Sequence, residues 1–284
     1  MSQHSSAVRE GSWQPRPLGP QSLLWRYGGD RRLAFTGLSA GILQLLHPAI
    51  AAGVSEHSNF FTDPWDRILR SVPQILGVIY SRDAEALGRR VRERHREIKG
   101  IDHRGRPYHA LEPSTFWFAH ATFQHAVKQI IDRFDHHRLG PAERESLYLD
   151  GVEWYRRYGV TMRPVPVDYA AFRVEWQRQC RDVLEMTPAA ERVIDITLHA
   201  RTRELPFLPA WTRPLHPLVV TPILRLTAIG GLPDAVRKRL GIPWRLDEEA
   251  EYRALQLTVR EGFRWVLPGL RQGPTAARSR QDAS

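Results

Sequence analysis

The apolar residues of this chain recur at helical spacing, and no stretch alternates apolar and polar residues over a sustained length. Several predicted helices open on a capping residue or a proline, as at Asp63-Pro64 and Gly140-Pro141. These signals predict helices over about 64–80, 113–134, 141–158, 168–184, 188–199 and 247–267. The sequence therefore predicts an all-α fold.

The helical region is expected to form a single domain. The chain has 284 residues, of which 42% are hydrophobic, and this is enough to bury a sizeable core. We expect a flexible N-terminal arm over 1–20, a multi-helix bundle over 21–270 and a disordered polar tail over 271–284. The proline-bearing stretches 163–167 and 204–217 are expected to connect helices.

The single cysteine, Cys180, limits the chemistry that the chain can carry. It excludes an intramolecular disulfide and a Cys-based zinc or iron-sulfur site, so a metal would need histidine or carboxylate ligands. No HExxH pair, EF-hand loop, phosphate-binding glycine loop or Gly-x-Ser-x-Gly elbow occurs. His120 and His125 lie about 140° apart around one predicted helix, so we expect them to pack in the core.

The formal net charge of +10 comes from 41 Lys and Arg residues against 31 Asp and Glu. The arginines are dispersed along the chain, often beside acidic residues as in RERHRE, and form no recognisable nucleic-acid motif. We therefore expect no nucleic-acid partner. The first 20 residues lack the regions of a signal peptide, which favours a cytoplasmic protein.

Residues 34–54 contain no Asp, Glu, Lys or Arg, and this length meets the criterion for a membrane span. Glycine and polar residues dilute the stretch, and Pro48 would break the helix near its end, so a buried central helix is the favoured interpretation. The apolar run 218–232 is interrupted by Pro222 and Arg225. It predicts a buried or membrane-skimming helix.

The stretch 83–99 is rich in Ala, Leu, Arg and Glu, which predicts a helix that ends at Gly100. His95 shares one face of this helix with the apolar residues Ala84, Leu87, Val91 and Ile98. An inward histidine on such a face is more often a hydrogen-bonded core residue than a ligand. Spacing alone leaves both interpretations open.

The predicted helix 64–80 carries a polar stripe at positions i, i+3, i+4 and i+7, formed by Arg67, Arg70, Ser71 and Gln74. Most stripes of this kind face solvent. Pro73 lies inside the same helix and predicts a kink, because proline removes a backbone hydrogen bond.

The segment HPAIAAGVSEHSNF, residues 47–60, contains two histidines and one glutamate at non-periodic spacing. We expect a loop there. Histidines and carboxylates in loops are typical of functional sites, so Glu56 and His57 are candidate site residues.

Four motifs occur in an order that is similar to that of a known family. LLHPAIAAGVSEHS is followed by DPWDRILRSV, by VRERHREIKGIDHRGRPYHALEPSTFWFAHAT and by LPDAVRKRLGIPW. Over about residues 27–268 the chain resembles the family of proteins of unknown function that includes the latex-clearing rubber oxygenases and the fungal mycophenolic-acid-pathway oxygenase. The resemblance implies a globin-like all-α fold that holds haem b and cleaves carbon–carbon double bonds with dioxygen.

The resemblance also implies roles for individual residues. His95 corresponds to the proximal ligand of the haem iron. Arg67, Arg70 and Ser71 correspond to an Arg-x-x-Lys-Thr stretch that lines the other side of the haem, which makes them candidate catalytic residues and the two arginines candidate cofactor ligands. Arginine replaces the lysine here and stays protonated, so an open or water-occupied distal site is expected. Glu56 is the nearest match to the catalytic glutamate, with His57 as its neighbour and competitor and as a further candidate cofactor-binding residue.

Together these implications predict a haem-dependent oxygenase that uses dioxygen as cosubstrate on a hydrophobic unsaturated molecule. The chain is shorter than typical rubber oxygenases, which favours a small isoprenoid or lipid substrate over rubber. Two alternatives stay open. One is a non-catalytic haem-binding redox, sensor or storage protein, and the other is a metal-free helical protein in peripheral contact with a membrane, in which His95 is structural.

Overall fold

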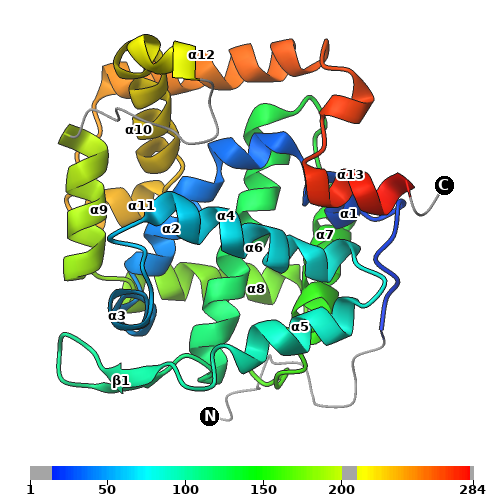
Figure 1. Cartoon of the computed structure of the whole chain (residues 1–284), viewed down its shortest axis with the longest axis vertical. Helices are drawn as coiled ribbons and strands as arrows, with labels where there is room; N and C mark the ends of the chain where they lie inside the picture. Colours follow the sequence, from blue (N-terminus) through cyan, green and yellow to red (C-terminus); the bar gives the residue numbers. More distant parts are fainter. Residues whose placement is uncertain (1–14, 200–209, 282–284) are drawn as a thin grey trace.

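The computed structural model describes residues 15–199 and 210–281, and this part of the chain is mainly helical (Figure 1). The expectation of an all-α fold is confirmed. The α-helices are α1 Leu23–Tyr27, α2 Gly37–Leu45, α3 Pro48–His57, α4 Pro64–Tyr80, α5 Ala84–Glu93, α6 Pro113–Phe134, α7 Pro141–Arg156, α8 Tyr169–Arg178, α9 Pro188–His199, α10 Thr221–Gly230, α11 Asp234–Arg239, α12 Leu246–Phe263 and α13 Pro274–Gln281. The shorter turns are η1 Arg31–Phe35, η2 Gln179–Val183, η3 Ala210–Leu215, η4 His216–Val220 and η5 Pro268–Leu270.

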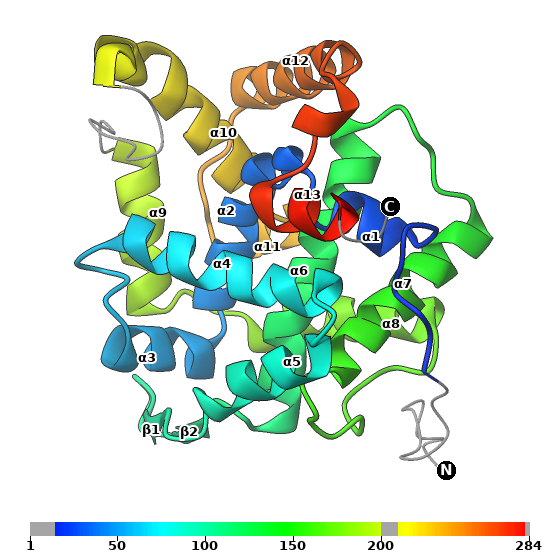
Figure 2. The same ribbon diagram turned by 45° about the vertical axis from the view of Figure 1, so that its right-hand side comes forward.

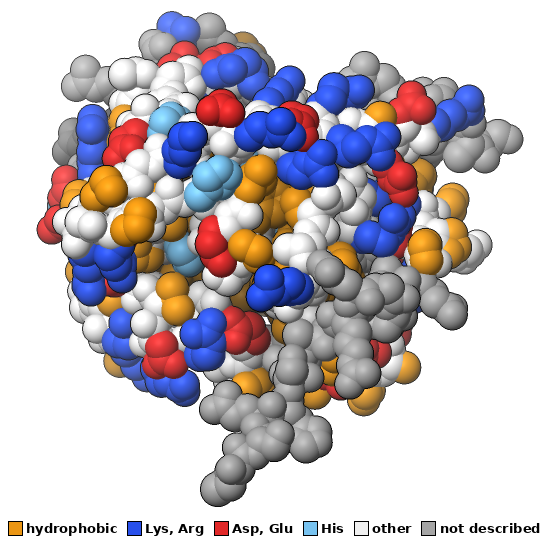
Figure 3. All heavy atoms as spheres, turned by 90° about the horizontal axis from the view of Figure 1, so that it is seen from below, with side chains coloured by type: hydrophobic (Ala, Val, Ile, Leu, Met, Phe, Trp, Pro, Cys, Tyr) orange, Lys and Arg blue, Asp and Glu red, His pale blue; other side chains and the backbone are white. Residues whose placement is uncertain are grey.

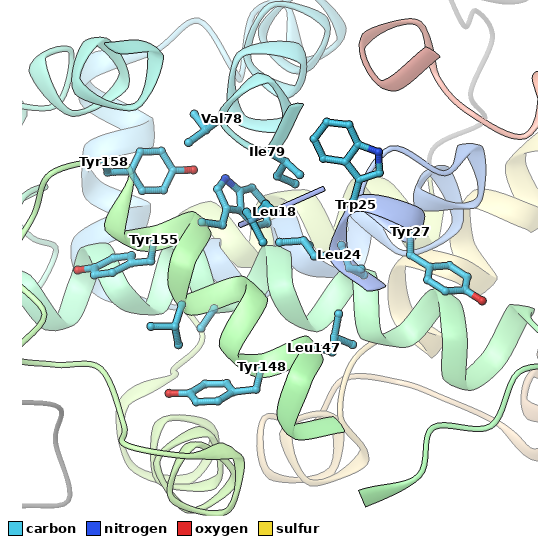
Figure 4. Packing of buried hydrophobic residues seen from close by; sticks show 14 of the residues in the cluster. Leu18, Leu24, Trp25, Tyr27, Val78, Ile79, Leu147, Tyr148, Tyr155 and Tyr158 are labelled. Atoms are coloured by element: carbon cyan, nitrogen blue, oxygen red, sulfur yellow. The ribbon is translucent and has the colours of Figure 1, made fainter. Parts of the chain in front are cut away.

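Helix α6 runs through the middle of the molecule, and α2, α7 and α12 pack against it (Figures 1 and 2). The larger buried cluster joins α1, the end of α4, α6 and α7, with Trp154 and Tyr155 completely buried. Figure 4 shows part of this cluster, in which Leu24 of α1 lies close to Ile79 of α4 and Leu147 of α7. A second cluster joins α2 to α9, α10 and α11. The first cluster also includes the buried end of α4 and Val91 of α5, so it fixes the positions of these two helices.

Most predicted helix starts are confirmed. Asp63 caps α4 by accepting a hydrogen bond from the backbone N–H of Asp66, and the prolines at 64, 113, 141 and 188 stand at the first helical positions. Helix α4 continues through Pro73 to its end at Tyr80. The stretch 163–167 is a connection, as expected. Of the expected connection 204–217, residues 204–209 lie outside the described residues, and residues 210–217 form η3 and the start of η4.

The uncharged stretch 34–54 folds as two helices, because Leu46 ends the first and Pro48 opens the second. Helices α2 and α3 meet at an angle of 99°. By length and composition this bent pair could enter a membrane, but no single helix of the described chain is long and apolar enough to cross one. The core side of α2 is buried, with Ile42, Leu43 and Leu45 in the second cluster.

The predicted helix over 83–99 is too long. Helix α5 ends at Glu93, and Lys99–Ile101 (β1) pairs antiparallel with Pro107–His109 (β2), with Gly100 opposite Tyr108. The hairpin turn is closed by Asp102, whose carboxylate accepts hydrogen bonds from the backbone N–H groups of Arg104 and Arg106, and by Gly105 at φ 76°. Pairing in the hairpin therefore outweighs the helix propensity of residues 94–99.

The first part of the expected tail, residues 271–277, is part of the packed structure, and α13 continues to Gln281. Gln272 forms a β-bridge with Asp30 and donates a side-chain hydrogen bond to the carbonyl oxygen of Arg26. Ala276 of α13 is completely buried, and a Cβ atom placed on Gly29 would lie 2.3 Å from the Ala276 Cβ. Only glycine at position 29 allows this close approach, and a composition-based reading does not detect such a contact.

Candidate functional site

His95 lies in the turn that follows α5, half-buried, with its ring 5.6 Å from the ring of Phe116 on α6. Its Nδ1 atom is 2.8 Å from the carbonyl oxygen of Val91 and donates a hydrogen bond to it. This fixes the tautomer, because a neutral imidazole whose Nδ1 carries the proton has its lone pair on Nε2. Among the described residues, none forms a hydrogen bond with Nε2.

The electrostatic surroundings keep His95 neutral. Burial lowers the pKa of His95, and the positive charges of Arg67 and Arg94 lower it further, against the opposing effect of the hydrogen bond to Val91. A neutral imidazole is the form that binds a metal ion. The predicted inward direction of this side chain is correct, although the residue lies in a turn and not on a helix.

Helix α4 packs along α5 (Figure 2). The side chain of Arg94 donates a hydrogen bond to the amide oxygen of Gln74 on α4 and so joins the two elements. The charge of Arg67, on the same helix, lowers the pKa of His95.

Arg67 is a half-buried cation. Its guanidinium donates a hydrogen bond to the hydroxyl oxygen of Ser71, and among the described residues no carboxylate forms an ion pair with it. Asp63, one helical turn earlier, shares only the backbone hydrogen bond of the helix with Arg67. Burial, together with the charge of Arg70, lowers the pKa of Arg67. An arginine in this setting favours an anionic ligand.

Arg70 has a different environment from Arg67. Its Nε atom donates to Asp66 at 2.8 Å, and its Nη2 atom donates to the side-chain oxygen of Asn59 at 3.1 Å. The guanidinium is exposed, so the structure holds it at the surface between α4 and the segment before it. Of the predicted stripe, Arg67 and Ser71 are thus joined to each other, and Arg70 is not joined to them through its side chain.

Glu56 and His57 lie on the last turn of α3, so the predicted loop over 47–60 is wrong for residues 48–57. Proline at the first helical position and alanines in the first turns explain the helix. The Glu56 carboxylate accepts a 2.7 Å hydrogen bond from the hydroxyl of Tyr108, and the Nε2 atom of His57 lies 3.2 Å from the carbonyl oxygen of Lys99. Burial, helped by Glu56, raises the pKa of Tyr108. Both candidates therefore contact the β-hairpin, and neither is hydrogen-bonded to His95 or Arg67.

The first half of α4 has an apolar face that the core does not fill. Ile68 and Val72 are only half-buried and belong to none of the hydrophobic clusters of the described chain, whereas Val78 and Ile79 farther along the helix are completely buried. In Figures 1 and 2, α4 crosses in front of α2. A Cβ atom added to Gly41 of α2 would have no atom within 4 Å. The first half of α4 therefore presents Ile68 and Val72 without cover from any hydrophobic cluster of the described chain.

The residues present fit a haem. The described chain contains no group of three or more His, Cys, Asp or Glu side chains that could hold a bare metal ion. A single neutral histidine suffices when a porphyrin supplies the other nitrogen ligands. His95 offers such a ligand, Arg67 offers a cation for a propionate, and Ile68 and Val72 offer an apolar wall.

Figure 3 shows the face of the molecule seen from below. Lys and Arg side chains gather along part of this face, and hydrophobic side chains are visible between the charged ones near its middle.

The hairpin turn carries its own ion pairs, in which Glu185 accepts from Arg104 at 2.6 Å. Most of the charge on this turn is therefore neutralised locally.

The fold and the site together define a mainly helical protein with a half-buried histidine, whose Nδ1 is hydrogen-bonded to the backbone, and an arginine whose charge lowers the pKa of that histidine. Residues 25–261 match the family described as the catalytic domain of the ER-bound oxygenases mpaB and mpaB′ and of rubber oxygenase. The chain belongs to this family of oxygenases, and the family that the four motifs indicated is confirmed. No curated protein and no solved structure matches the chain.

Sequence reasoning missed several residues of this site. Phe116 is 21 positions from His95 and could not be associated with it by local spacing. Gln74 was visible in the stripe, but its link to Arg94 needs the relative placement of α4 and α5.

Proposed function

We propose that this member of the oxygenase family binds haem b through His95 and oxidises a hydrophobic unsaturated molecule, such as an isoprenoid or a lipid. The observation that carries the proposal is the hydrogen bond from Nδ1 of His95 to the carbonyl oxygen of Val91. A histidine that binds a metal almost always donates its other ring N–H to an acceptor, which orients the ring and raises the basicity of the ligating nitrogen.

Each remaining residue has a physical task. Arg67 pairs with a haem propionate, and Ser71 orients the guanidinium by accepting its hydrogen bond. Phe116 packs edge-on against the imidazole and limits its rotation. The haem, when bound, supplies an iron that activates dioxygen for cleavage of a carbon–carbon double bond.

The substrate class follows from the apolar wall. Ile68 and Val72 offer no hydrogen bond to a substrate, so they exclude water and favour a hydrocarbon. A hydrocarbon with a double bond satisfies both this wall and the oxygenase chemistry of the family.

Glu56 is proposed as the base that removes a proton from the substrate. Its Oε2 atom is engaged by Tyr108, which leaves the second carboxylate oxygen to accept a proton. The neighbouring His57 is held by the hairpin carbonyl of Lys99 and serves as the control position.

The test of this function is oxygen consumption by haem-loaded protein. Unsaturated isoprenoid lipids are expected to stimulate uptake and yield carbonyl products, whereas saturated chains of equal length are not. Glu56→Gln should lower the turnover number by about 10²-fold or more with haem content unchanged, and His57→Gln should not. Haem binding without substrate-dependent uptake by any unsaturated lipid would contradict the oxygenase role and favour a redox or sensor protein.

A further inference from the structure

A series of aromatic rings leads inward from His95. The ring centroid of Phe116 on α6 is 5.6 Å from that of His95 and 6.0 Å from that of Tyr155 on α7. The ring of Tyr155 in turn lies 5.0 Å from that of Trp117. Phe116, Trp117 and Tyr155 are all buried. The series therefore passes from the candidate site into the larger buried cluster, part of which Figure 4 shows.

The same series reaches the surface again at α8. The ring of Phe172 is 6.3 Å from that of Trp117 and 6.0 Å from that of Trp176, one helical turn further along α8. Phe172 is buried, whereas Trp176 is half-buried and therefore reaches solvent. Each separation lies in the range of about 4.5–7 Å that is typical of aromatic rings in contact. We call Phe116, Tyr155, Trp117, Phe172 and Trp176 the aromatic chain.

The two tryptophans are the members of the aromatic chain that can give up an electron. The phenyl ring of phenylalanine is too difficult to oxidise. Tyrosine loses an electron readily only when a neighbouring base accepts its phenolic proton. The hydroxyl of Tyr155 is buried without a hydrogen-bond partner among the described residues, and burial raises its pKa. Tyr155 therefore keeps its proton, and Trp117 and Trp176 are the electron donors.

The surroundings of Trp176 tolerate the positive charge that remains when its ring loses an electron. Its ring stacks on the imidazole of His125 at a centroid distance of 4.5 Å. Burial lowers the pKa of His125 to about 3, so this imidazole is neutral near pH 7. A protonated imidazole at this distance would repel the charge on the oxidised indole.

We propose that the aromatic chain carries electrons from the protein surface to the haem when hydrogen peroxide reacts there in the absence of substrate. This inference rests on the proposed haem ligation by His95. Hydrogen peroxide takes up two electrons and two protons to become two molecules of water. Trp117 gives each electron and regains it from Trp176, and a soluble one-electron donor such as ascorbate restores Trp176. Two ascorbate ions supply both the electrons and the protons. The chain thereby protects the site from oxidative damage.

The experiment adds hydrogen peroxide to the haem-loaded full chain without ascorbate and maps tryptophan oxidation by mass spectrometry of peptides. Trp265 is the internal reference, because it is 87% exposed in the turn after α12, outside the aromatic chain. An oxidant that diffuses freely reacts with Trp265 before it reacts with the half-buried Trp176. Electron transfer through the aromatic chain predicts the opposite order in haem-loaded protein, and the addition of ascorbate should suppress the oxidation of Trp176.

Trp117→Phe tests the route itself, because phenylalanine keeps much of the packing but cannot give up an electron. This variant should lose the excess oxidation of Trp176 over Trp265 while its Soret band is retained. Trp154→Phe is the matched control, because Trp154 is a completely buried tryptophan of the same cluster that does not belong to the aromatic chain. The control variant should keep the excess. Circular dichroism of each variant establishes that the fold is retained.

The Soret band reports haem binding and the peptide map reports electron transfer, so the proposed function and this inference can fail separately. Haem-loaded protein in which Trp265 is oxidised as strongly as Trp176 would overturn the inference. The same conclusion would follow if Trp117→Phe kept the excess oxidation of Trp176, or if Trp154→Phe lost as much of it as Trp117→Phe.

Discussion

The imidazole of His95 is anchored to the carbonyl oxygen of Val91, four residues earlier in the chain, through a 2.8 Å hydrogen bond. Val91 is buried on α5, so the acceptor belongs to a packed helix and cannot readily move. The last turn of α5 therefore sets both the direction of the ring and the identity of the nitrogen that stays free.

Removal of the positive charge of Arg67 is expected to raise the pKa of His95, because that charge disfavours the imidazolium form. Arg67→Gln should therefore shift the titration of the His95 ring protons to higher pH, as measured by nuclear magnetic resonance of the haem-free protein. Arg70→Gln is the control, since the guanidinium of Arg70 is held at the surface by Asp66. Equal shifts in both variants would show that Arg67 has no special proximity to His95.

Gly41→Phe tests whether the haem lies beside α2. A Cβ atom at this position has no neighbour within 4 Å, and replacing a helix-interior glycine favours the helix, so the fold should be kept. Haem affinity, measured by titration of absorbance, should fall by about tenfold or more because the phenyl ring competes for the same space. Gly262→Phe, on α12, should leave affinity unchanged. Unchanged affinity in Gly41→Phe would place the haem elsewhere.

Gly88→Ala is expected to destabilise the fold by about 1–3 kcal/mol. A Cβ atom at this position would lie 2.1 Å from the carbonyl oxygen of Arg157, where α5 approaches the end of α7. Gly262→Ala has no such neighbour and should stabilise α12 by up to about 1 kcal/mol. Urea unfolding of the two variants measures both effects, and similar stabilities would contradict the close approach of α5.

Acid should destabilise the protein through His47. Burial lowers the pKa of His47 to about 4 in the folded protein, whereas its pKa in the unfolded chain is about 6.5. The unfolded chain therefore binds more protons between these values, and the free energy of unfolding falls as the pH falls from 6.5 towards 4, by about 1.4 kcal/mol per pH unit. His47→Gln should reduce this slope in urea unfolding, and His199→Gln, at an exposed position, should not. Equal slopes in all three proteins would contradict the prediction.

The helix starts of the fold could be predicted from the sequence because their signals are local. Asp63 as the capping residue and Pro64 at the first helical position predict the start of α4 without information from any other element. The end of α5 could not be predicted, since residues 94–99 have helical propensity and only pairing with 107–109 makes part of them a strand. Ala276 packs against Gly29, which is near the other end of the described chain. The residues next to either position carry no signal that predicts this contact.

The site was predictable in part for the same reason. The helical repeat placed His95 inward and grouped Arg67 with Ser71, and both features are present. The repeat also grouped Arg70 with them, but Asp66 and Asn59 hold that guanidinium at the surface, and such competition depends on the segment that precedes α4. The prediction of a loop around Glu56 is wrong because alanine-rich segments form helices even when they carry histidines.

The central claim is that His95 binds haem iron, and the visible absorption spectrum tests it most directly. Protein purified from haem-supplemented cells should show a Soret band, and His57→Ala prepared in the same way should keep it. His95→Ala should lose or shift the band while circular dichroism shows that the helices remain. A parent protein without a Soret band, or an unchanged band in folded His95→Ala, would contradict the assignment.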